Sequence, residues 1–170
     1  MNLRKLTEIT DYHIHPESKA QIRFHDCDPF RHLNQSRYLD YFVSAREDQV
    51  RDNYGLDIHK FAQENGHAWM VTKNQIAYIR QVLVNEMVTM QTHVVGYDQS
   101  NIHVEMIMWD EAKVKTKALL WGTFAYVNLM ESKRAIHPPE LMEFFGKLKW
   151  NGTDGMTFDQ RAAAMYIIGK

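Results

Sequence analysis

The stretch IRFHDCDPFRHLNQSRYLDYFVSARED, residues 22–48, decides the fold. Its first part alternates apolar and polar side chains, so we expect a short strand over residues 20–26. Its second part repeats apolar side chains every three or four residues, which predicts an amphipathic helix over residues 35–54. Asn34 suits the N-cap of this helix, and Gly55 suits the left-handed residue that ends it. Two aspartates stand between the strand and the helix.

The rest of the chain contains further helices and a run of long strands. The expected elements are a helix over residues 57–65, strands over 68–80, 82–97, 101–110 and 113–130, and a helix that starts at Pro138 and Pro139. The breaks between the strands are short, so strands that follow each other in the sequence should pair as antiparallel neighbours in a meander. Residues 150–170 are expected to form a mobile tail with a weakly helical patch at 159–168.

One long helix precedes four long strands, and one face of those strands needs a cover. The economical solution is an α+β fold in which a curved antiparallel sheet wraps around that helix. We see no internal repeat or low-complexity tract, so residues 1–170 are expected to form a single domain with its core at about 20–146. A single helix does not cover both faces of such a sheet, and its edge strands stay unpaired. We therefore expect a homo-oligomer, a dimer or a tetramer.

Composition excludes several classes of partner. Lysine and arginine number 20 and aspartate and glutamate 21, so the net charge of −1 provides no broad field for nucleic acid or for an anionic membrane. The sequence contains no apolar run long enough to span a bilayer and begins without a signal-peptide pattern, so a cytoplasmic protein is expected. The single cysteine, Cys27, excludes an internal disulfide and is expected to be a small buried side chain.

The quoted stretch resembles the signature of the 4-hydroxybenzoyl-CoA thioesterase-like family of acyl-CoA thioesterases. That signature has an aromatic residue, D-(T/C)-D, a short turn, H-(V/L)-N, and a helix with Y-(L/F)-x-(Y/F)-F and A-R. The resemblance continues more weakly through NQIAYIRQVLVNEMVTMQTHV, residues 74–94, and SKRAIHPPELMEFF, residues 132–145. It implies the hotdog fold. One departure is Arg31, because many relatives have glycine just before the histidine.

The resemblance implies that Asp28, the second aspartate of the motif, is the nucleophile or the general base of thioester hydrolysis. The start of a helix offers unpaired N–H groups and the positive end of the helix dipole, which can hold the negative charge that develops on the carbonyl oxygen. The backbone N–H of Gln35 is the expected donor. His32 and Asn34 match the family's H-x-N and are expected to order the loop, and possible roles in binding the thioester or a water stay open. Asp26 is expected to be a supporting residue.

The resemblance also implies an acyl-CoA substrate, so coenzyme A is part of the substrate and no separate cofactor is expected. An acyl carrier protein is an alternative carrier of the acyl group. Arg80, Lys133 and Arg134 lie at strand ends near where the family places the nucleotide of coenzyme A. Tyr38, which opens the helix motif, is expected to contact the substrate as well.

Two alternatives remain open. The first is a hotdog protein that binds an acyl thioester or a protein partner without hydrolysing it, and the departures at Arg31 and Gln35 motivate it. The second is a metal-dependent enzyme, in which His25, Asp26, Asp28 and His32 would supply ligands. No HExxH or CxxC spacing occurs in the chain, so no metal is expected.

Overall fold

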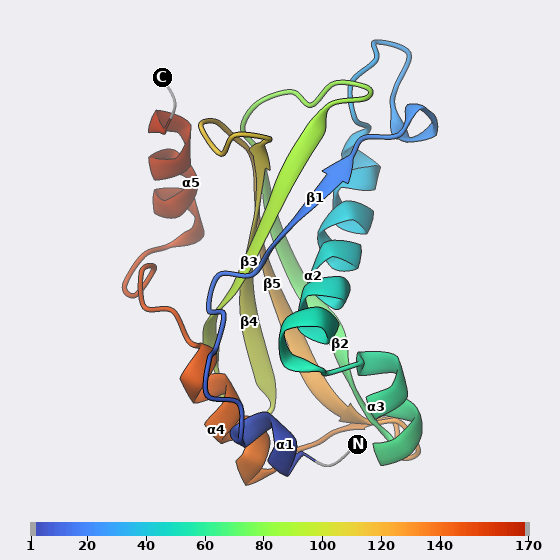
Figure 1. The fold of residues 1–170 in the computed structure, drawn as a ribbon, viewed down its shortest axis with the longest axis vertical. Coiled ribbons are helices and arrows are strands. Elements are labelled where there is room, and N and C mark those ends of the chain that lie inside the picture. Colours follow the sequence, from blue (N-terminus) through green and yellow to red (C-terminus); the bar gives the residue numbers. More distant parts are fainter. Residues whose placement is uncertain (1–2, 169–170) are drawn as a thin grey trace.

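The computed structural model describes residues 3–168, which form a six-stranded antiparallel sheet with helices on both sides (Figure 1). The strands are β1 Glu17–Gln21, β2 His67–Tyr78, β3 Met87–Tyr97, β4 Asn101–Asp110, β5 Thr116–Asn128 and β6 Lys133–Arg134. The helices are α1 Arg4–Thr7, α2 Tyr38–Tyr54, α3 Ile58–Asn65, α4 Pro139–Leu148 and α5 Phe158–Ile167. The sheet curls around α2, so the expected α+β class is confirmed.

Local signals set the ends of α2. The chain enters it through a 3-10 turn over Gln35–Arg37, and Asn34 Oδ1 caps this turn by accepting the backbone N–H of Ser36 at 3.0 Å. Gly55 ends the helix with a φ of 65°, a conformation that glycine adopts without the steric cost of a Cβ. The predicted cap at Asn34 and end at Gly55 are therefore confirmed, but the first three residues of the predicted helix, 35–37, form the 3-10 turn.

The order of strands in the sheet is β1-β3-β4-β5-β2. The prediction of a meander holds for β3, β4 and β5, but it is wrong for β2, which pairs with β5 instead of β3. Ile76, for example, lies opposite Leu120 in this pairing. The free edge of β2 is one border of the sheet, and β1 forms the other.

The predicted meander is wrong at β2 because residues 82–86, which were expected to start the next strand, do not belong to β3. The apolar residues in this segment pair with the loop before α2: Leu33 N–H donates to Val82 O at 2.8 Å, and Val84 N–H donates to Arg31 O at 3.0 Å. The connection from β2 to β3 is therefore long enough to cross the end of the sheet. The strand predicted over 113–130 likewise begins only at residue 116, after a turn.

The strand predicted over residues 20–26 is also displaced. β1 ends at Gln21, and residues 24–26 form a 3-10 turn closed by the hydrogen bond from Cys27 N–H to Phe24 O at 3.1 Å. Phe24 is 81% exposed, so the apolar and polar alternation in this segment does not mark a buried face. Asp26 consequently lies in a turn.

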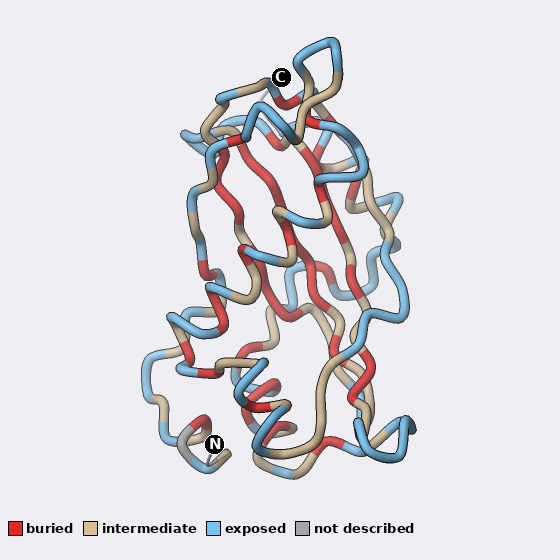
Figure 2. Tube along the Cα trace, turned by 90° about the vertical axis from the view of Figure 1, so that its right-hand side faces the viewer, coloured by how far each residue is buried: buried red, intermediate tan, exposed pale blue. Residues whose placement is uncertain are grey.

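The inner face of the sheet packs on α2. Buried positions run along the strands and along the side of the helix that faces them (Figure 2). The main contributors from the helix are Tyr38, Phe42, Ala45 and Val50, and the sheet supplies Val88, Met90, Val104, Met106 and Leu120. Burial of this apolar surface is the main force that holds the helix in the curl of the sheet.

Part of the outer face of the sheet is covered by α5, which lies on the opposite side from α2 (Figure 1). The prediction of a mobile tail is therefore wrong for the part of residues 150–170 that the structure describes; residues 169–170 lie outside it. Thr157 and Gln160 form a reciprocal capping box that starts the helix. A separate apolar cluster then fixes α5 on the sheet; its buried members are Ile79, Ile107, Trp109, Leu119, Ala162 and Met165.

A buried ionic cluster fastens α5 to β4. Glu105 is 0% exposed, and its carboxylate accepts Nε and Nη2 of Arg161 at 3.0 and 2.8 Å. His93 Nε2 lies 2.9 Å from the same carboxylate, and Trp121 Nε1 donates to it at 2.7 Å. Burial alone would raise the pKa of Glu105, but the hydrogen bonds from His93, Arg161 and Trp121 lower it to about 2. His15 continues the cluster, with its Nδ1 3.2 Å from His93 Nδ1.

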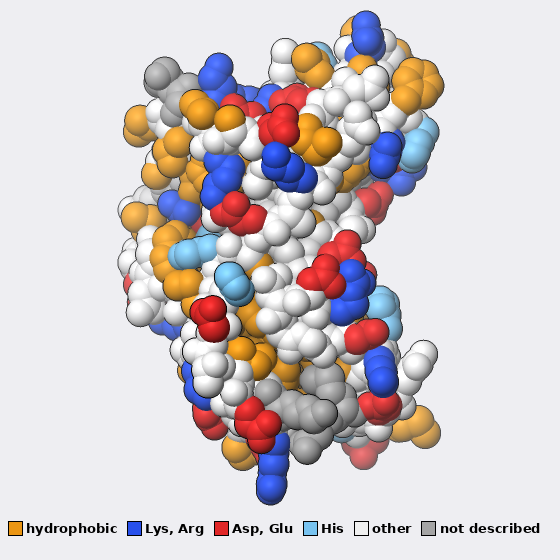
Figure 3. All heavy atoms as spheres, viewed as in Figure 1, with side chains coloured by type: hydrophobic (Ala, Val, Ile, Leu, Met, Phe, Trp, Pro, Cys, Tyr) orange, Lys and Arg blue, Asp and Glu red, His pale blue; other side chains and the backbone are white. Residues whose placement is uncertain are grey.

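The surface carries charges of both signs. Figure 3 shows the molecule from the same side as Figure 1. On this face, lysine, arginine, aspartate and glutamate side chains are intermixed, and hydrophobic side chains gather along the edge that α5 forms. None of the helices in residues 3–168 is long and apolar enough to cross a membrane.

Candidate active site

The loop between β1 and α2, residues 22–34, fixes the Asp28 carboxylate through one of its oxygens. Oδ1 accepts the backbone N–H of Phe30 at 2.9 Å and of His32 at 3.0 Å. Oδ2 has no hydrogen-bond donor among residues 3–168. The side chain is half-buried, so it is held in one orientation with one oxygen left open.

Asp26 has a different environment. Tyr41 Oη donates to its Oδ2 at 2.8 Å, and Arg37 Nε lies 3.6 Å from its Oδ1. The side chain is only 12% exposed, and its backbone carbonyl accepts the N–H of Asn34 at 2.9 Å. Asp26 therefore ties the loop to the first turns of α2, which agrees with the supporting role expected for it.

The start of α2 presents an open donor close to this loop in the chain. Gln35 is the first residue of the 3-10 turn, and its N–H has no acceptor within the part of the chain that the structure describes. The carbonyl of Gln35 accepts a hydrogen bond from Tyr78 Oη at 3.2 Å, which connects the helix start to the end of β2. The helix start therefore has the free backbone donor that an oxyanion site requires.

His32 lies in the loop before α2 and is half-buried, whereas Tyr38 is the first residue of α2 and is buried. The backbone of His32 bridges to Leu83, and its half-buried imidazole makes no hydrogen bond to another described residue. Tyr38 is buried in the core, where its ring meets that of Tyr78 edge-on at 5.0 Å. Burial, followed by the nearby Tyr78 and Glu86, raises the pKa of Tyr38 to about 12.

The predicted nucleotide-binding residues do not lie together. The Arg80 guanidinium donates to the backbone carbonyls of Thr116, Tyr166 and Ile168, so it holds the end of α5. Lys133 and Arg134 form β6, which pairs with Asn128 and Val127 at the end of β5. That end lies beside His67 at the start of β2, whereas Arg80 follows the other end of β2. The structure therefore brings Arg80 near the Asp28 end of the sheet and places Lys133 and Arg134 at the opposite end.

Arg31 occupies the position where many relatives have glycine. Its φ is 66°, so the loop keeps the left-handed conformation and Arg31 adopts it with a Cβ. The turn therefore has a left-handed residue at this position although that residue is not glycine.

The Cys27 thiol is a poor nucleophile in this loop. Burial, followed by the charges of Asp26 and Asp28, raises the pKa of the thiol, which keeps it protonated. It points to Arg23 O at 3.5 Å.

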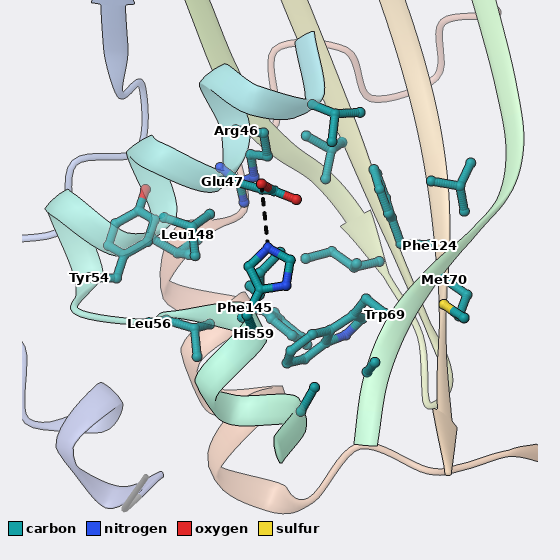
Figure 4. Close-up of a pocket in the computed structure, with 18 of the residues that line it drawn as sticks. Arg46, Glu47, Tyr54, Leu56, His59, Trp69, Met70, Phe124, Phe145 and Leu148 are labelled. Carbon is teal, nitrogen blue, oxygen red and sulfur yellow. Dashed lines mark ion pairs between the residues drawn. The ribbon is translucent and has the colours of Figure 1, made fainter. Parts of the chain in front are cut away.

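A cavity of about 410 Å³ lies between α2, α3, α4 and the inner face of the sheet (Figure 4). Trp69, Met70 and Phe124 come from the strands, and Phe145 and Leu148 come from α4. The polar side chains on its lining include Arg46, Glu47 and His59, and His59 Nε2 lies 3.6 Å from Glu47 Oε2. Size and lining suit an apolar ligand with few polar groups.

In one chain the cavity is separated from Asp28. Its lining residue nearest to the start of α2 is Val43, and the lining continues to Leu148 and to α3. Tyr38 and Phe42, both buried, fill the space between α2 and the sheet above Val43. The buried side chains of Tyr38 and Phe42 therefore lie between the Asp28 end of α2 and this cavity.

Sequence patterns did not locate the cavity, because six elements contribute to it and no contiguous motif marks it. They also missed the Glu105 cluster, although a glutamate among the apolar residues of β4 was a usable signal. As for metals, residues 3–168 contain no group of three or more histidine, cysteine, aspartate or glutamate side chains placed to hold an ion.

Comparison with known proteins identifies relatives of the same architecture. The long-chain acyl-CoA thioesterase FadM of Escherichia coli is 24% identical over 129 residues, which cover 75% of this chain and 94% of FadM. The crystal structure of the probable thioesterase YbaW from E. coli superposes with a TM-score of 0.69 at 19% identity, covering 79% of this chain and 99% of YbaW. The Staphylococcus aureus protein SAV2348, solved in complex with CoA, gives 0.72 at 12% identity, covering 85% of this chain and 94% of SAV2348.

These superpositions confirm the hotdog fold. The model of the thioesterase-like superfamily matches residues 22–145, which include the loop with Asp28, all of α2, and β2 to β6. α5 lies outside the matched range. The sheet curled around α2, the loop that precedes it and this match together identify the chain as a member of the thioesterase-like superfamily.

Proposed function

We propose that this protein hydrolyses acyl-CoA thioesters to a free acid and the thiol of CoA. The observation that carries the proposal is the Asp28 carboxylate, fixed through Oδ1 and open at Oδ2 in the loop that leads into α2. The name of FadM and the CoA complex of SAV2348 support this substrate class. An acyl carrier protein remains the alternative carrier of the same thioester.

In the general-base route, Asp28 Oδ2 takes a proton from a water molecule whose oxygen bonds to the thioester carbon. The Gln35 N–H then donates to the carbonyl oxygen as negative charge develops on it, supported by the dipole of α2. The C–S bond breaks, and the sulfur leaves with the proton that Asp28 returns. In the nucleophilic route, Oδ2 itself bonds to the carbon and the C–S bond breaks to release the thiolate. Water then hydrolyses the resulting anhydride, which regenerates the Asp28 carboxylate, gives the free acid and supplies the proton that the thiolate takes up.

A second subunit would bring the loop that carries Asp28 (residues 22–34, the acid loop) next to the cavity of its partner. The edge of β2 is unpaired within the chain, and Met70 and Val71 on it are exposed although apolar. β2 has 12 residues and so spans about 35–40 Å, with Tyr78 near Asp28 at one end and the cavity-lining Ala68 and Trp69 near the other.

Antiparallel pairing of two β2 edges about a twofold axis would reverse one strand against the other. The Asp28 end of one subunit would then lie beside the cavity end of its partner, so the acyl chain would enter the partner's cavity while its thioester stays at Asp28. In this arrangement Asp28 of one subunit and the cavity of the other form one site, although the two lie apart within one chain. Dimerisation would then be required for catalysis.

Val71→Glu is expected to convert this dimer to monomers, because it replaces an exposed apolar side chain on the pairing edge of each subunit with a carboxylate that the paired edge would have to take up. Size-exclusion chromatography with light scattering measures the change, and Val71→Thr, which keeps the β-branched shape, serves as the matched control. Thiol release should fall with the loss of the dimer. A wild-type protein that is monomeric yet active would contradict the shared site.

The experiment that tests the proposed function is a thiol-release assay with the purified protein across saturated acyl-CoAs of increasing chain length. Turnover with at least one of them is the expected result. Saturable binding of acyl-CoA without thiol release would instead assign a binding protein and overturn the proposal.

A further inference from the structure

Arg46 projects from α2 into the lining of the apolar cavity (Figure 4). The apolar side chains around it come from three strands and three helices. Two further polar side chains of the lining, Glu47 and His59, lie 3.6 Å from each other, measured between Oε2 and Nε2. Glu47 and His59 are also more exposed than the cavity interior, with 37% and 78% of their side chains accessible. They lie on the rim, and their pairing leaves Arg46 without a carboxylate from its own helix.

The partners of Arg46 are neutral. Its Nη1 donates to Thr92 Oγ1 at 3.1 Å, and Thr92 in turn donates to Gln49 Oε1 at 2.6 Å. Tyr54 is a second neutral neighbour: burial lowers the pKa of Arg46, and the Tyr54 hydroxyl opposes that shift. Within residues 3–168 no carboxylate forms an ion pair with Arg46.

Some of the other arginines of this chain have anionic partners. Arg161 pairs with Glu105 in the buried cluster, and Arg51 pairs with Asp48 on the surface. A guanidinium stays charged in a protein and loses part of its hydration when it is half-buried beside apolar side chains, as Arg46 is, so a counter-ion at this position would be favourable. A carboxylate brought by a ligand would remove that cost and form the strongest kind of hydrogen bond available to the guanidinium.

We propose that the cavity binds a linear aliphatic chain that carries a carboxylate, and that Arg46 is the residue that receives this carboxylate. The apolar lining contacts the methylene chain. The N–H groups of Arg46 that do not bond to Thr92 or Tyr54 donate to the carboxylate. The proposal rests on the proposed function for the acyl class of the chain, but binding of the acid itself requires no turnover.

The test is calorimetric titration of the purified full-length protein with decanoate, decan-1-ol and decylammonium ion, which differ only in the terminal group. The expected result is that decanoate binds about ten-fold or more tightly than decan-1-ol, and that decylammonium binds most weakly. Equal affinities for the acid and the alcohol would overturn the proposal.

Arg46→Met is expected to abolish the preference for decanoate while affinity for decan-1-ol stays unchanged, and Arg46→Lys should keep part of it. Glu47→Gln, on the rim of the same cavity, is the matched control and should keep the preference. An undiminished preference in Arg46→Met would overturn the assignment of Arg46. If that variant fails to fold, the comparison of the three ligands on the wild-type protein decides alone.

The carboxylate has two possible sources, which hydrolysis distinguishes. A higher kcat/KM for the monothioester of decanedioic acid than for decanoyl-CoA would place the carboxylate at the far end of the acyl substrate. Competitive inhibition by decanoate, with decanoyl-CoA the better substrate, would identify the free acid as the ligand. If the protein hydrolyses neither thioester, the proposed function is wrong, but the calorimetric result on binding of the acid is unaffected.

Discussion

Asp28→Asn is expected to lower thiol release from acyl-CoA by about 10²–10⁴-fold, the usual contribution of a positioned acid or base. The substitution is nearly isosteric, and the amide oxygen can still accept the N–H groups of Phe30 and His32 that fix the side chain. What it removes is the charge and the basic oxygen at Oδ2. The loop should therefore keep its shape while the chemistry is lost.

The measurement is kcat and kcat/KM for the best acyl-CoA, with thermal unfolding as the check on the fold. Loss in kcat at unchanged thermal stability is the result that fits a group acting on the thioester. Full activity in Asp28→Asn would remove Asp28 from the mechanism.

Asp26→Asn provides the contrast within the same motif. Its carboxylate is held by Tyr41 and lies near Arg37, so the variant should lose stability of the loop and a smaller part of the rate. Similar losses of rate in both variants, with equal losses of stability, would indicate that the two aspartates both serve the loop and that neither reacts.

Local signals in the sequence predicted the helical part of the fold well. Asn34 caps the 3-10 turn that leads into α2, and Gly55 ends α2. Asp57 and Gly66 bound α3 in the same way, because caps and left-handed ends depend on only a few neighbouring residues. The loop that carries Asp28 was predictable for the same reason. Asp28 and Gln35 are only seven residues apart, so a short loop keeps them close. These features were accessible without any knowledge of the sheet.

Strand order was not accessible in the same way. The run of apolar residues 82–84 fits a strand of a meander as well as it fits the segment that pairs with the loop before α2, and only the three-dimensional contact with Leu33 decides between them. The cavity depends on six elements and on Trp69 and Phe124 meeting across the sheet, so no periodic pattern contains it. The docking of α5 rests on Arg161 reaching Glu105 from 56 residues away.

Arg161→Met is expected to lower the free energy of unfolding by about 3 kcal/mol, because it leaves the carboxylate of Glu105 buried with part of its compensation removed. Urea unfolding measures the change. Arg51→Met, which removes a guanidinium paired with Asp48 and Asp52 on the surface, is the matched control and should leave the free energy of unfolding nearly unchanged.

The same cluster predicts how stability depends on pH. The carboxyl of Glu105 has its pKa lowered in the folded protein to about 2 from an ordinary value of 4.5, so its charge stabilises the fold fully above pH 4.5 and that contribution is lost as the pH falls toward 2. The shift corresponds to about 3 kcal/mol. Glu105→Gln should flatten this part of the profile, and an unchanged profile would show that other carboxylates dominate acid unfolding.

Undocking of α5 would expose the outer face of the sheet, since Ile107, Trp109 and Leu119 are covered by Ala162 and Met165 of that helix. An apolar face of this kind would then associate with another copy or aggregate. Arg161→Met at acid pH is therefore expected to show both faster proteolysis after residue 150 and a larger particle in light scattering. If proteolysis rises while the particle size stays constant, the apolar cluster holds the outer face closed without Arg161, and the ionic cluster serves only to orient α5.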